Sequence, residues 1–349
     1  MSAGKPFTLK KFATFCAVAA CLSLQPLMAT NTHASTPINF TLDWRFEGPS
    51  APFLMALDKG YFAEEGLSVT IDSGNGSSGA VTRVATGAYD MALADFNALV
   101  EYSADNPDSG IQAVYMLYNH TPAAVFTLKE SGIDTPADLA GKTLAAPVFD
   151  AGRKAWPAFA AHNGLAVDAV SWQSVDPAIR ETLLARRQVD GITGFYFTSL
   201  LNLEARGVAL DQITVMPYSE FGVSLYGNAI IASEALLADN PEAVAGFTRA
   251  FNKALIETIQ DPEAAVKYVS SRDGLVDEAL ELRRLKLALD AQVITEETLA
   301  EGLGAVTFDR LEQSIAEAVS SFGLESTPDA AELFNASLLP ERSSRSIPR

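Results

Sequence analysis

The sequence predicts an α/β protein in which two α/β lobes are joined by two crossover strands, with a ligand cleft between the lobes. From residue 38 onward, strand patterns alternate with helical patterns, which is typical of right-handed βαβ units built around a parallel sheet. The alternation pauses in a β-rich run at residues 114–128 and restarts at residue 141. The chain has 349 residues, a length that favours two domains over one.

The N-terminal residues 1–34 have the layout of a secretory signal peptide. Three lysines precede an apolar stretch at residues 12–24, and the small residues Thr32 and Ala34 suit cleavage after Ala34. The apolar stretch is shorter than the roughly 20 residues that a membrane-spanning helix needs. We therefore expect a periplasmic protein with no stable membrane insertion. Residues 18–21 also fit a lipoprotein cleavage box loosely, so the alternative is a lipid anchor on Cys21.

Composition excludes several kinds of chemistry for residues 35–349. Both cysteines, Cys16 and Cys21, lie before residue 35, so the remaining chain offers no thiol for a disulfide, a metal site or nucleophilic catalysis. The formal net charge of the whole chain is −18 at pH 7. Nucleic-acid binding needs clustered Lys and Arg side chains to contact phosphates, so we expect no nucleic-acid partner. The negative net charge favours solubility and does not indicate which ligand is bound.

The first lobe is predicted from alternating strand and helix patterns. Its expected elements, in chain order, are a strand at 38–44, a helix at 51–65 closed by Gly66, a strand at 67–72, a polar loop at 74–79, a helix at 80–86, a strand at 89–94 and a helix at 96–104. A crossing between the lobes is expected within 114–128.

The second lobe repeats this alternation before the chain returns to the first. Its expected elements are a capped short helix at 135–139, strands at 141–146, 170–175, 189–194 and 213–217, and helices at 153–163, 177–187 and 198–206. Residues 226–232 lead back to strongly helical segments at 241–270, interrupted at Pro262, and at 277–289. The lobes would comprise residues 35–119 with 225–335, and 120–224, followed by a flexible tail at 336–349.

Short motifs link the chain to a known family. The runs LDW at residues 42–44, KGYFAEEGL at 59–67, GAYDMALAD at 87–95 and DLAGK at 138–142 occur in the expected order. Together they resemble the periplasmic solute-binding proteins of the nitrate/taurine/sulfonate and thiamine-pyrimidine-precursor group. The most specific run, at residues 59–67, is predicted to be scaffold, because Gly60 and Gly66 end or turn a helix and Tyr61 and Phe62 supply apolar anchor surface.

The resemblance implies a type II periplasmic-binding-protein fold that works with an ABC permease and its ATPase subunit. It implies a small-molecule ligand, no cofactor, no metal, no catalytic residue and a monomeric protein. A ligand that touches both lobes would stabilise the closed state by its differential affinity. At residues 45–50 the run RFEGPS replaces the Pro-Asn and His that pyrimidine-precursor binders carry, which indicates a subfamily with its own ligand.

Candidate ligand-binding residues of the first lobe follow from the rule that ligands lie at the carboxyl ends of strands. The rule selects Asp43, Trp44, Arg45, Ser77, Ser78, Gly79, Asp95 and Phe96. Trp44 would stack on a planar ligand and donate one N–H. Asp43 either contacts ligand or satisfies N–H groups of its own turn. The Ser-Gly loop either holds an anion or caps the following helix.

The same rule selects six residues of the second lobe. They are Asp150, Arg153, Phe195, Tyr196, Tyr218 and Glu220. Arg153 faces either an anionic ligand group or solvent. Of the aromatic residues after the strand at 189–194, at least one is expected in the core, and Tyr196 is expected to face the cleft. Glu220 either accepts hydrogen bonds from a ligand amine or is an exposed turn carboxylate.

Two other classes of function are weighed against a binding protein. Fungal relatives make the thiamine pyrimidine with a Cys-rich motif and a sacrificial His, whereas residues 35–349 hold no Cys and only two histidines, His120 and His162. Neither shows metal-ligand spacing. A ligand-sensing accessory protein would need a C-terminal membrane or kinase segment, and the chain ends in a polar run. The expected ligand is a small organic anion or a planar heterocycle.

Overall fold

The computed structural model describes residues 1, 4, 35–272 and 274–347. Residues Ser35–Arg349 form one compact unit. The signal-peptide prediction, the cleavage site at Ala34 and the alternative lipid anchor at Cys21 lie outside the described residues. Among the helices that are described, none is both long and apolar enough to cross a membrane.

Ten strands form two five-stranded sheets. The first sheet contains β1 (Thr36–Thr41), β2 (Leu67–Asp72), β3 (Met91–Asp95), β4 (Gln112–Met116) and β10 (Asn228–Ala232) in the order β2-β1-β3-β10-β4. The second contains β5 (Ala123–Leu128), β6 (Thr143–Ala146), β7 (Ser171–Ser174), β8 (Gly191–Phe195) and β9 (Ile213–Pro217) in the order β7-β6-β8-β5-β9. This is the predicted division into two α/β halves.

Both sheets are mixed, whereas the strand–helix alternation predicted parallel sheets. The strands β2, β1 and β3 run parallel, as do β7, β6 and β8. The strand β10 is antiparallel to both of its neighbours in the first sheet, and β5 is antiparallel to both of its neighbours in the second. In each sheet, the antiparallel strand is the one that the chain forms directly after it crosses from the other sheet: β5 follows β4, and β10 follows β9.

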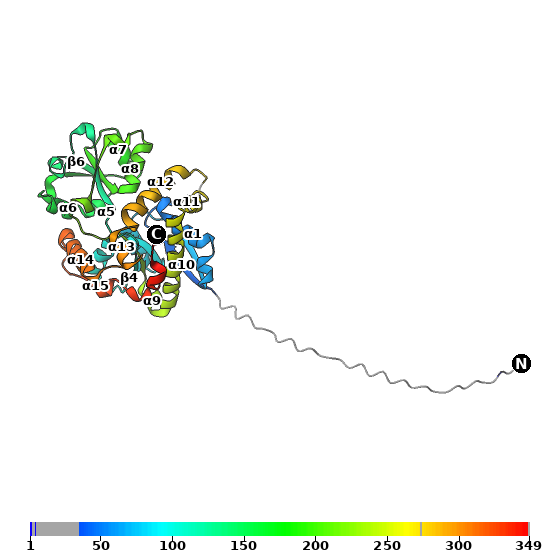
Figure 1. Cartoon of the computed structure of the whole chain (residues 1–349). Coiled ribbons are helices and arrows are strands. Elements are labelled where there is room, and N and C mark those ends of the chain that lie inside the picture. The colour runs from blue at the N-terminus through cyan, green and yellow to red at the C-terminus, as the bar shows by residue number, and fades with distance from the viewer. Residues whose placement is uncertain (2–3, 5–34, 273, 348–349) are drawn as a thin grey trace. The chain divides into compact units, whose positions relative to one another are not determined.

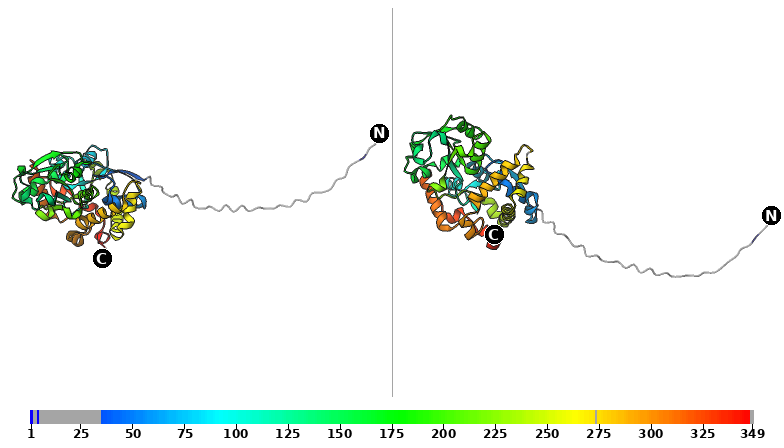
Figure 2. Two further views of the ribbon diagram at one scale, coloured as in Figure 1. Left: turned by 90° about the horizontal axis from the view of Figure 1, so that it is seen from above. Right: turned by 45° about the horizontal axis from the view of Figure 1, so that its top comes forward.

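Helices cover the two sheets separately. The helices that belong to the first half are α1 (Ala51–Asp58), α2 (Tyr61–Glu64), α3 (Ser77–Ala85), α4 (Phe96–Asp105), α9 (Glu234–Asp239), α10 (Pro241–Gln260), α11 (Pro262–Ser270), α12 (Glu278–Ala288), α13 (Glu296–Glu301), α14 (Phe308–Phe322) and α15 (Ala330–Leu333). Those of the second half are α5 (Ala151–Lys154), α6 (Trp156–His162), α7 (Arg180–Ala185) and α8 (Tyr196–Ala205). In Figures 1 and 2 these green elements group together, apart from the yellow helices α10 and α11.

Local sequence explains where several helices start and stop. The predicted break at Pro262 is confirmed: Asp261 caps α11 by accepting from the Ala264 N–H, and proline occupies the first turn. The single helix predicted at 51–65 is wrong, because Gly60 adopts φ +77° and divides it into α1 and α2. A positive φ of this kind costs glycine little and most other residues more.

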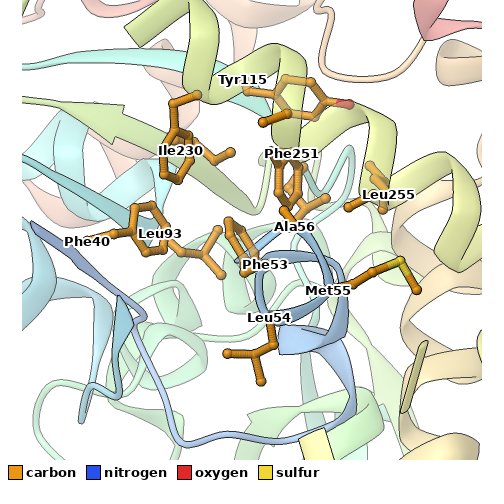
Figure 3. Packing of buried hydrophobic residues seen from close by; sticks show 14 of the residues in the cluster. Phe40, Phe53, Leu54, Met55, Ala56, Leu93, Tyr115, Ile230, Phe251 and Leu255 are labelled. Atoms are coloured by element: carbon orange, nitrogen blue, oxygen red, sulfur yellow. The ribbon is translucent and has the colours of Figure 1, made fainter. Parts of the chain in front are cut away.

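Aromatic side chains form the centre of the first core. Phe40 from β1 stacks on Phe53 of α1 and on Phe247 of α10, with ring centroids 5.1 and 5.0 Å apart. Phe53 also lies 4.3 Å from Phe251. Figure 3 shows Phe40, Phe53 and Phe251 clustered with Leu93 of β3. These buried rings hold α1 and α10 against the sheet and so fix the loop that follows β1.

The tail prediction is wrong for residues 336–347. These residues form two 3₁₀ turns, Ala336–Leu338 and Arg342–Arg345. The Arg345 side chain is buried and donates hydrogen bonds to the carbonyl oxygens of Pro340 and Leu303, at 2.8 and 2.9 Å. The polar composition of the segment suggested disorder, but its polar groups are satisfied against the folded body.

The two crossovers between the sheets run side by side. Residues 117–122 join β4 to β5, and residues 218–227 join β9 to β10. The N–H of Gly227 donates to the Tyr118 carbonyl at 3.0 Å, and the N–H of Thr121 donates to the Leu225 carbonyl at 2.9 Å. A Cβ on Gly227 would lie only 2.6 Å from the His120 carbonyl oxygen. Glycine is therefore required where the crossovers touch.

Replacing Gly227 with alanine should destabilise the protein by about 1–3 kcal/mol, because the added methyl group overpacks the contact between the crossovers. Urea unfolding of the Gly227→Ala variant and the wild type measures the change in the free energy of unfolding. The matched control is Gly79→Ala, where the nearest atom to the new Cβ is 3.6 Å away. Equal stability of Gly227→Ala and wild type would show that the crossovers can separate at no cost.

Candidate functional site

A cavity of about 90 Å³ lies between the two halves of the unit. It is lined by residues 42–45, 47, 49, 50, 76, 77 and 93 of the first half, by Tyr118 and Asn228 at the crossovers, and by residues 147, 149–151, 180, 195, 197 and 198 of the second half. One water needs roughly 10–15 Å³ of such space, so the cavity has room for a small organic molecule.

The buried carboxylate of Asp43 is part of the polar lining. It follows β1, and its Oδ2 accepts hydrogen bonds from Asn228 Nδ2 at 2.7 Å and from Ser77 Oγ at 3.1 Å. Its backbone carbonyl accepts from the Gly76 N–H. Burial raises the pKa of Asp43 to about 6, and the two side-chain donors oppose that rise. The site therefore holds an acceptor that changes charge near neutral pH.

Aromatic side chains form the walls of the cavity. Trp44 and Tyr118 belong to the first half and its crossover, and Phe149, Phe195 and Phe197 belong to the second. Tyr118 and Phe197 meet edge to face with centroids 5.9 Å apart. Such faces suit a flat ligand, because aromatic stacking contributes beyond simple area burial.

Glu47 connects the cavity wall to both halves. Its carboxylate accepts from the Trp44 indole N–H at 3.3 Å, from Thr198 Oγ1 at 3.1 Å and from Arg284 at 2.9 Å. Thr198 belongs to α8 of the second half, and Arg284 to α12 of the first. Arg284 also donates to Asn202 of α8 at 3.3 Å. These hydrogen bonds cross the space between the halves and orient the indole.

The buried guanidinium of Arg180 is neutralised by protein carboxylates. It donates to Asp150 at 2.9 Å and to Glu181 at 2.7 Å, and it donates to Ser199 Oγ at 2.9 Å. Asp150 also accepts from Thr193 Oγ1 at 2.7 Å and caps α5. Because its N–H groups are used internally, Arg180 shapes the wall more than it offers charge to a ligand.

Six of the fourteen candidate residues line the cavity. They are Asp43, Trp44, Arg45, Ser77, Asp150 and Phe195. Arg45 is exposed at this point, and its guanidinium carbon lies 5.7 Å from the centroid of the Trp44 ring. The carboxyl-end rule therefore locates the cavity from both halves.

The other eight candidates lie elsewhere. Ser78 and Asp95 line a smaller neighbouring cavity, Gly79 is exposed in α3, and Phe96 is fully buried in the core. Arg153 stacks 5.1 Å from the Trp172 ring and donates to Ser174, and Tyr196 packs against buried apolar side chains of the second half. The Tyr218 hydroxyl donates to the Gly152 carbonyl, and Glu220 is exposed on its turn.

Sequence reasoning missed several lining residues. Asn228 begins β10, and since that strand is antiparallel, its amino end lies where the parallel strands end. Glu47 lies in a loop and Arg180 in α7, at positions that the strand-end rule does not select. Glu47 lies within the RFEGPS run, whose departure from the family pattern was the available signal.

The histidines of residues 35–347 lie away from the main cavity. His120 and His162 both lie outside the main cavity: His120 lines a separate groove, and His162 pairs with Glu317 at 2.8 Å. Within residues 35–272 and 274–347, no group of three or more His, Cys, Asp or Glu side chains is placed to hold a metal ion.

Two mixed α/β sheets, two adjoining crossovers and a cavity between the halves define the periplasmic-binding-protein fold. The chain belongs to the family described as NMT1/THI5 like, whose model matches residues 48–265. The matched segment runs from the loop after β1 to α11, and so includes the whole second half.

Relatives of known name include binding proteins and synthases. The chain is 27% identical over 222 residues to the riboflavin-binding protein RibY of Chloroflexus aurantiacus, covering 62% of this chain and 60% of that protein. It is 26% identical over 251 residues to the formylaminopyrimidine-binding protein of Halalkalibacterium halodurans, covering 71% and 74%. It is also 26% identical over 250 residues to a 4-amino-5-hydroxymethyl-2-methylpyrimidine phosphate synthase of Aspergillus parasiticus, covering 67% and 70%.

Solved structures share the fold at low sequence identity. The aliphatic sulphonate-binding protein SsuA of Escherichia coli matches with a TM-score of 0.67 at 13% identity, covering 86% of this chain and 91% of that one. The nitrate-binding protein NrtA of Synechocystis PCC 6803 matches with a TM-score of 0.66 at 12% identity, covering 87% of both chains. Both proteins are periplasmic binding proteins by name.

The Asp43 carboxyl should make stability depend on pH. Its pKa is about 6 in the folded protein and near 3.9 when unfolded, so the folded state binds this proton more tightly. The free energy of unfolding should therefore rise as the pH falls from about 6 to about 4, by up to about 3 kcal/mol. In Asp43→Asn this contribution should vanish.

Urea unfolding at pH 7, 6, 5 and 4.5 measures the effect as the difference between wild type and Asp43→Asn. Subtraction removes the parallel contribution of Asp95, whose pKa burial also raises to about 6. The control is Asp211→Asn, which changes an exposed carboxylate. A constant difference across the pH range would contradict the raised pKa of Asp43.

Proposed function

We propose that the protein is the periplasmic solute-binding component of an ABC importer and that it binds a planar nitrogen heterocycle in the cavity between its halves. The observation that carries this proposal is the buried acceptor Asp43, held by Asn228 and Ser77 between aromatic walls. A ring N–H or amino group on a flat ligand would donate to this carboxylate while the ring contacts Trp44 and Phe195.

The charges around the cavity favour a heterocycle over an organic anion. The buried cation Arg180 is already shared between Asp150 and Glu181, and Arg284 is paired with Glu47. An anionic group placed beside Asp43 and Glu47 would meet like charge. Arg45 is exposed, so it would pair with an anionic substituent of the ligand only at the margin of the cavity.

The names of the relatives agree with this class of ligand. Riboflavin and formylaminopyrimidine both contain flat, nitrogen-rich rings. The structural neighbours that bind sulphonate and nitrate support the fold, and their ligands are a separate chemical class. A heterocycle is therefore the preferred member of the two ligand classes that the sequence predicted.

Binding without catalysis is the favoured activity. Some relatives are synthases by name, and the fungal chemistry implied by the family resemblance uses cysteines and a sacrificial histidine. Residues 35–349 contain no cysteine, and neither His120 nor His162 lines the cavity. We propose that cargo is captured and released unaltered to a permease with its ATPase subunit.

Capture would proceed by closure of two lobes, formed by residues 35–119 with 225–335 and by residues 120–224. The ligand would contact Asp43 and Trp44 from one lobe and Asp150 and Phe195 from the other. Its differential affinity for the closed state would shift the population toward closure. The paired crossovers at Tyr118 and Gly227 would act as the hinge.

A ligand screen tests the proposed class. Aminopyrimidines and flavins should raise the melting temperature of the protein, since they bind the folded state, whereas taurine, alkanesulfonates and nitrate should not. Differential scanning fluorimetry of residues 35–349 provides the measurement. Stabilisation by sulfonates alone, undiminished in Asp43→Asn, would overturn the proposal in favour of an anion-binding protein.

Replacing Trp44 with alanine should weaken binding of the heterocycle about tenfold or more, because the ring loses its stacking surface and Glu47 loses an indole donor. Isothermal titration calorimetry gives the affinity. The matched control is Trp172→Phe, which alters an indole of β7 outside the cavity. Unchanged affinity in Trp44→Ala would remove Trp44 from the ligand site.

Affinity for the heterocycle should also fall as the pH drops below about 6, by up to about tenfold per pH unit. Protonation of Asp43 removes the acceptor that the ligand needs, and its pKa is about 6. The titration requires a ligand that does not itself ionise between pH 4 and 7. In Asp43→Asn the affinity should be lower and independent of pH; a wild-type pH profile in that variant would contradict the role of Asp43.

A further inference from the structure

Helix α12 of the first half packs against α8 of the second half, as Figure 1 shows. Three side chains of α12 are involved. Leu287 lies four residues after Arg283 and three residues after Arg284, so the three side chains share one face of the helix. Each of them contacts the second half of the protein, and we call this surface the α12 face.

Both arginines of the α12 face bond to α8. Arg284 donates to Asn202 Oδ1 at 3.3 Å, and Arg283 pairs with Glu204 at 2.7 Å. The Arg284 side chain is buried, so water competes little for its hydrogen bond with Asn202. The Arg283 side chain is 47% exposed and that of Glu204 is 32% exposed, so their ion pair is screened and contributes less.

Leu287 adds an apolar contact to the same face. It is partly buried, and it packs against both the core of the first half and the apolar cluster of the second half that contains Leu200 and Leu203 of α8. Apolar burial flanked by polar contacts is the usual composition of an interface between two folded bodies. The protein therefore supplies all the groups that join α12 to α8.

The α12 face lies away from the paired crossovers. Helix α12 continues into a π-helical turn, Leu289–Val293, in which the Gln292 carbonyl accepts from the Asn119 N–H of the first crossover at 3.0 Å. Arg284 lies about two helical turns before Gln292, which is roughly 12 Å along the axis. A rotation of the lobes about the crossovers would therefore separate α8 from the α12 face while the Gln292 contact persists.

Glu47 links the α12 face to the main cavity. Its carboxylate pairs with Arg284, accepts from Thr198 of α8 and accepts from the Trp44 indole N–H. Trp44 and Glu47 both line the cavity. A ligand that fixes the indole would thus also hold Glu47 in the position that bonds to α8.

We propose that the α12 face is a latch, which holds the two lobes closed through contacts of the protein with itself. Asn202 and Glu204 are its partners on α8, and neither lines the cavity. The ligand then needs to supply only part of the free energy of closure, because the latch supplies the rest. The inference rests on the lobe motion of the proposed function and is independent of the class of ligand.

The distance between α12 and the end of α8 reports the state of the latch. Residues 35–349 contain no cysteine, so the substitutions Ala209→Cys and Ala279→Cys allow two spin labels to be attached specifically. Both alanines are exposed, one after α8 and one in the first turn of α12. Double electron–electron resonance of the labelled protein, with no ligand added, gives the ratio of long to short distances.

The double variant Asn202→Ala/Glu204→Ala removes both polar partners from α8. It should raise the ratio of long to short distances about tenfold, because it loses one hydrogen bond to a buried charge and one exposed ion pair. Alanine favours helix, so α8 should remain folded. Leu287→Ala weakens the latch from the opposite lobe, should shift the distances in the same direction, and replaces the double variant if that variant does not fold.

The matched control is Glu130→Ala, which breaks an exposed ion pair with Arg187 inside the second half and should leave the distances unchanged. Wild-type distances in the latch variant, or an equal shift in the control, would overturn the latch. Since this measurement needs no ligand, it is separate from the ligand screen. Failure of every heterocycle to bind would defeat the proposed ligand class and leave the result on the latch standing.

Discussion

The hydrogen bond from Asn228 to Asp43 is the interaction on which the architecture of the site depends. Asp43 follows the first strand and Asn228 begins the last, so the bond joins residues 185 positions apart. A buried carboxylate is costly unless it is hydrogen-bonded, so the returning strand must arrive in one register to satisfy it. That register, Asn228 opposite Asp95, also places Gly227 between the crossovers.

Buried charge near the cavity is arranged so that the protein neutralises itself. Arg284 is 2% exposed and pairs with Glu47 and Glu281, while Arg180 pairs with Asp150 and Glu181. Removing one member of such a group would leave a buried charge unpaired, which is far more costly than the pair is stabilising. The pairs therefore act mainly as positioning groups, whereas the buried Asp43 carboxylate is held by the neutral donors Asn228 and Ser77.

The fold was predictable from the sequence to the extent that each element carries its own signal. Strands at 67–72 and 213–217 and the helix break at Pro262 occur where their patterns predicted. The antiparallel strands β5 and β10 carry no such signal, because direction within a sheet is a property of the whole topology. Two cavity residues lie at the carboxyl ends of parallel strands, Asp43 just after β1 and Phe195 at the end of β8, and were accessible to the strand-end rule.

The same topology explains which site residues were missed. An antiparallel strand presents its amino end at the edge where its parallel neighbours present their carboxyl ends, so Asn228 was invisible to a rule about carboxyl ends. Conversely, Tyr218 follows β9, which lies at the edge of the second sheet, and its side chain turns into the core, where it stacks 4.6 Å from Phe159. Position after a strand selects the edge of a sheet and not the side chain's direction.

The most recognisable motif of the family is scaffold, and this separates family membership from ligand choice. Within residues 59–67, Lys59 and the Tyr61 hydroxyl both bond to Glu257 of α10, and Phe62 stacks 4.6 Å from Phe247. These contacts anchor α2 to α10, and none of these residues lines the cavity. The motif therefore contributes to the packing that holds the loop after β1. That loop supplies Asp43, Trp44, Arg45 and Glu47 to the cavity lining, so the family motif and the cavity lining are separate parts of the chain.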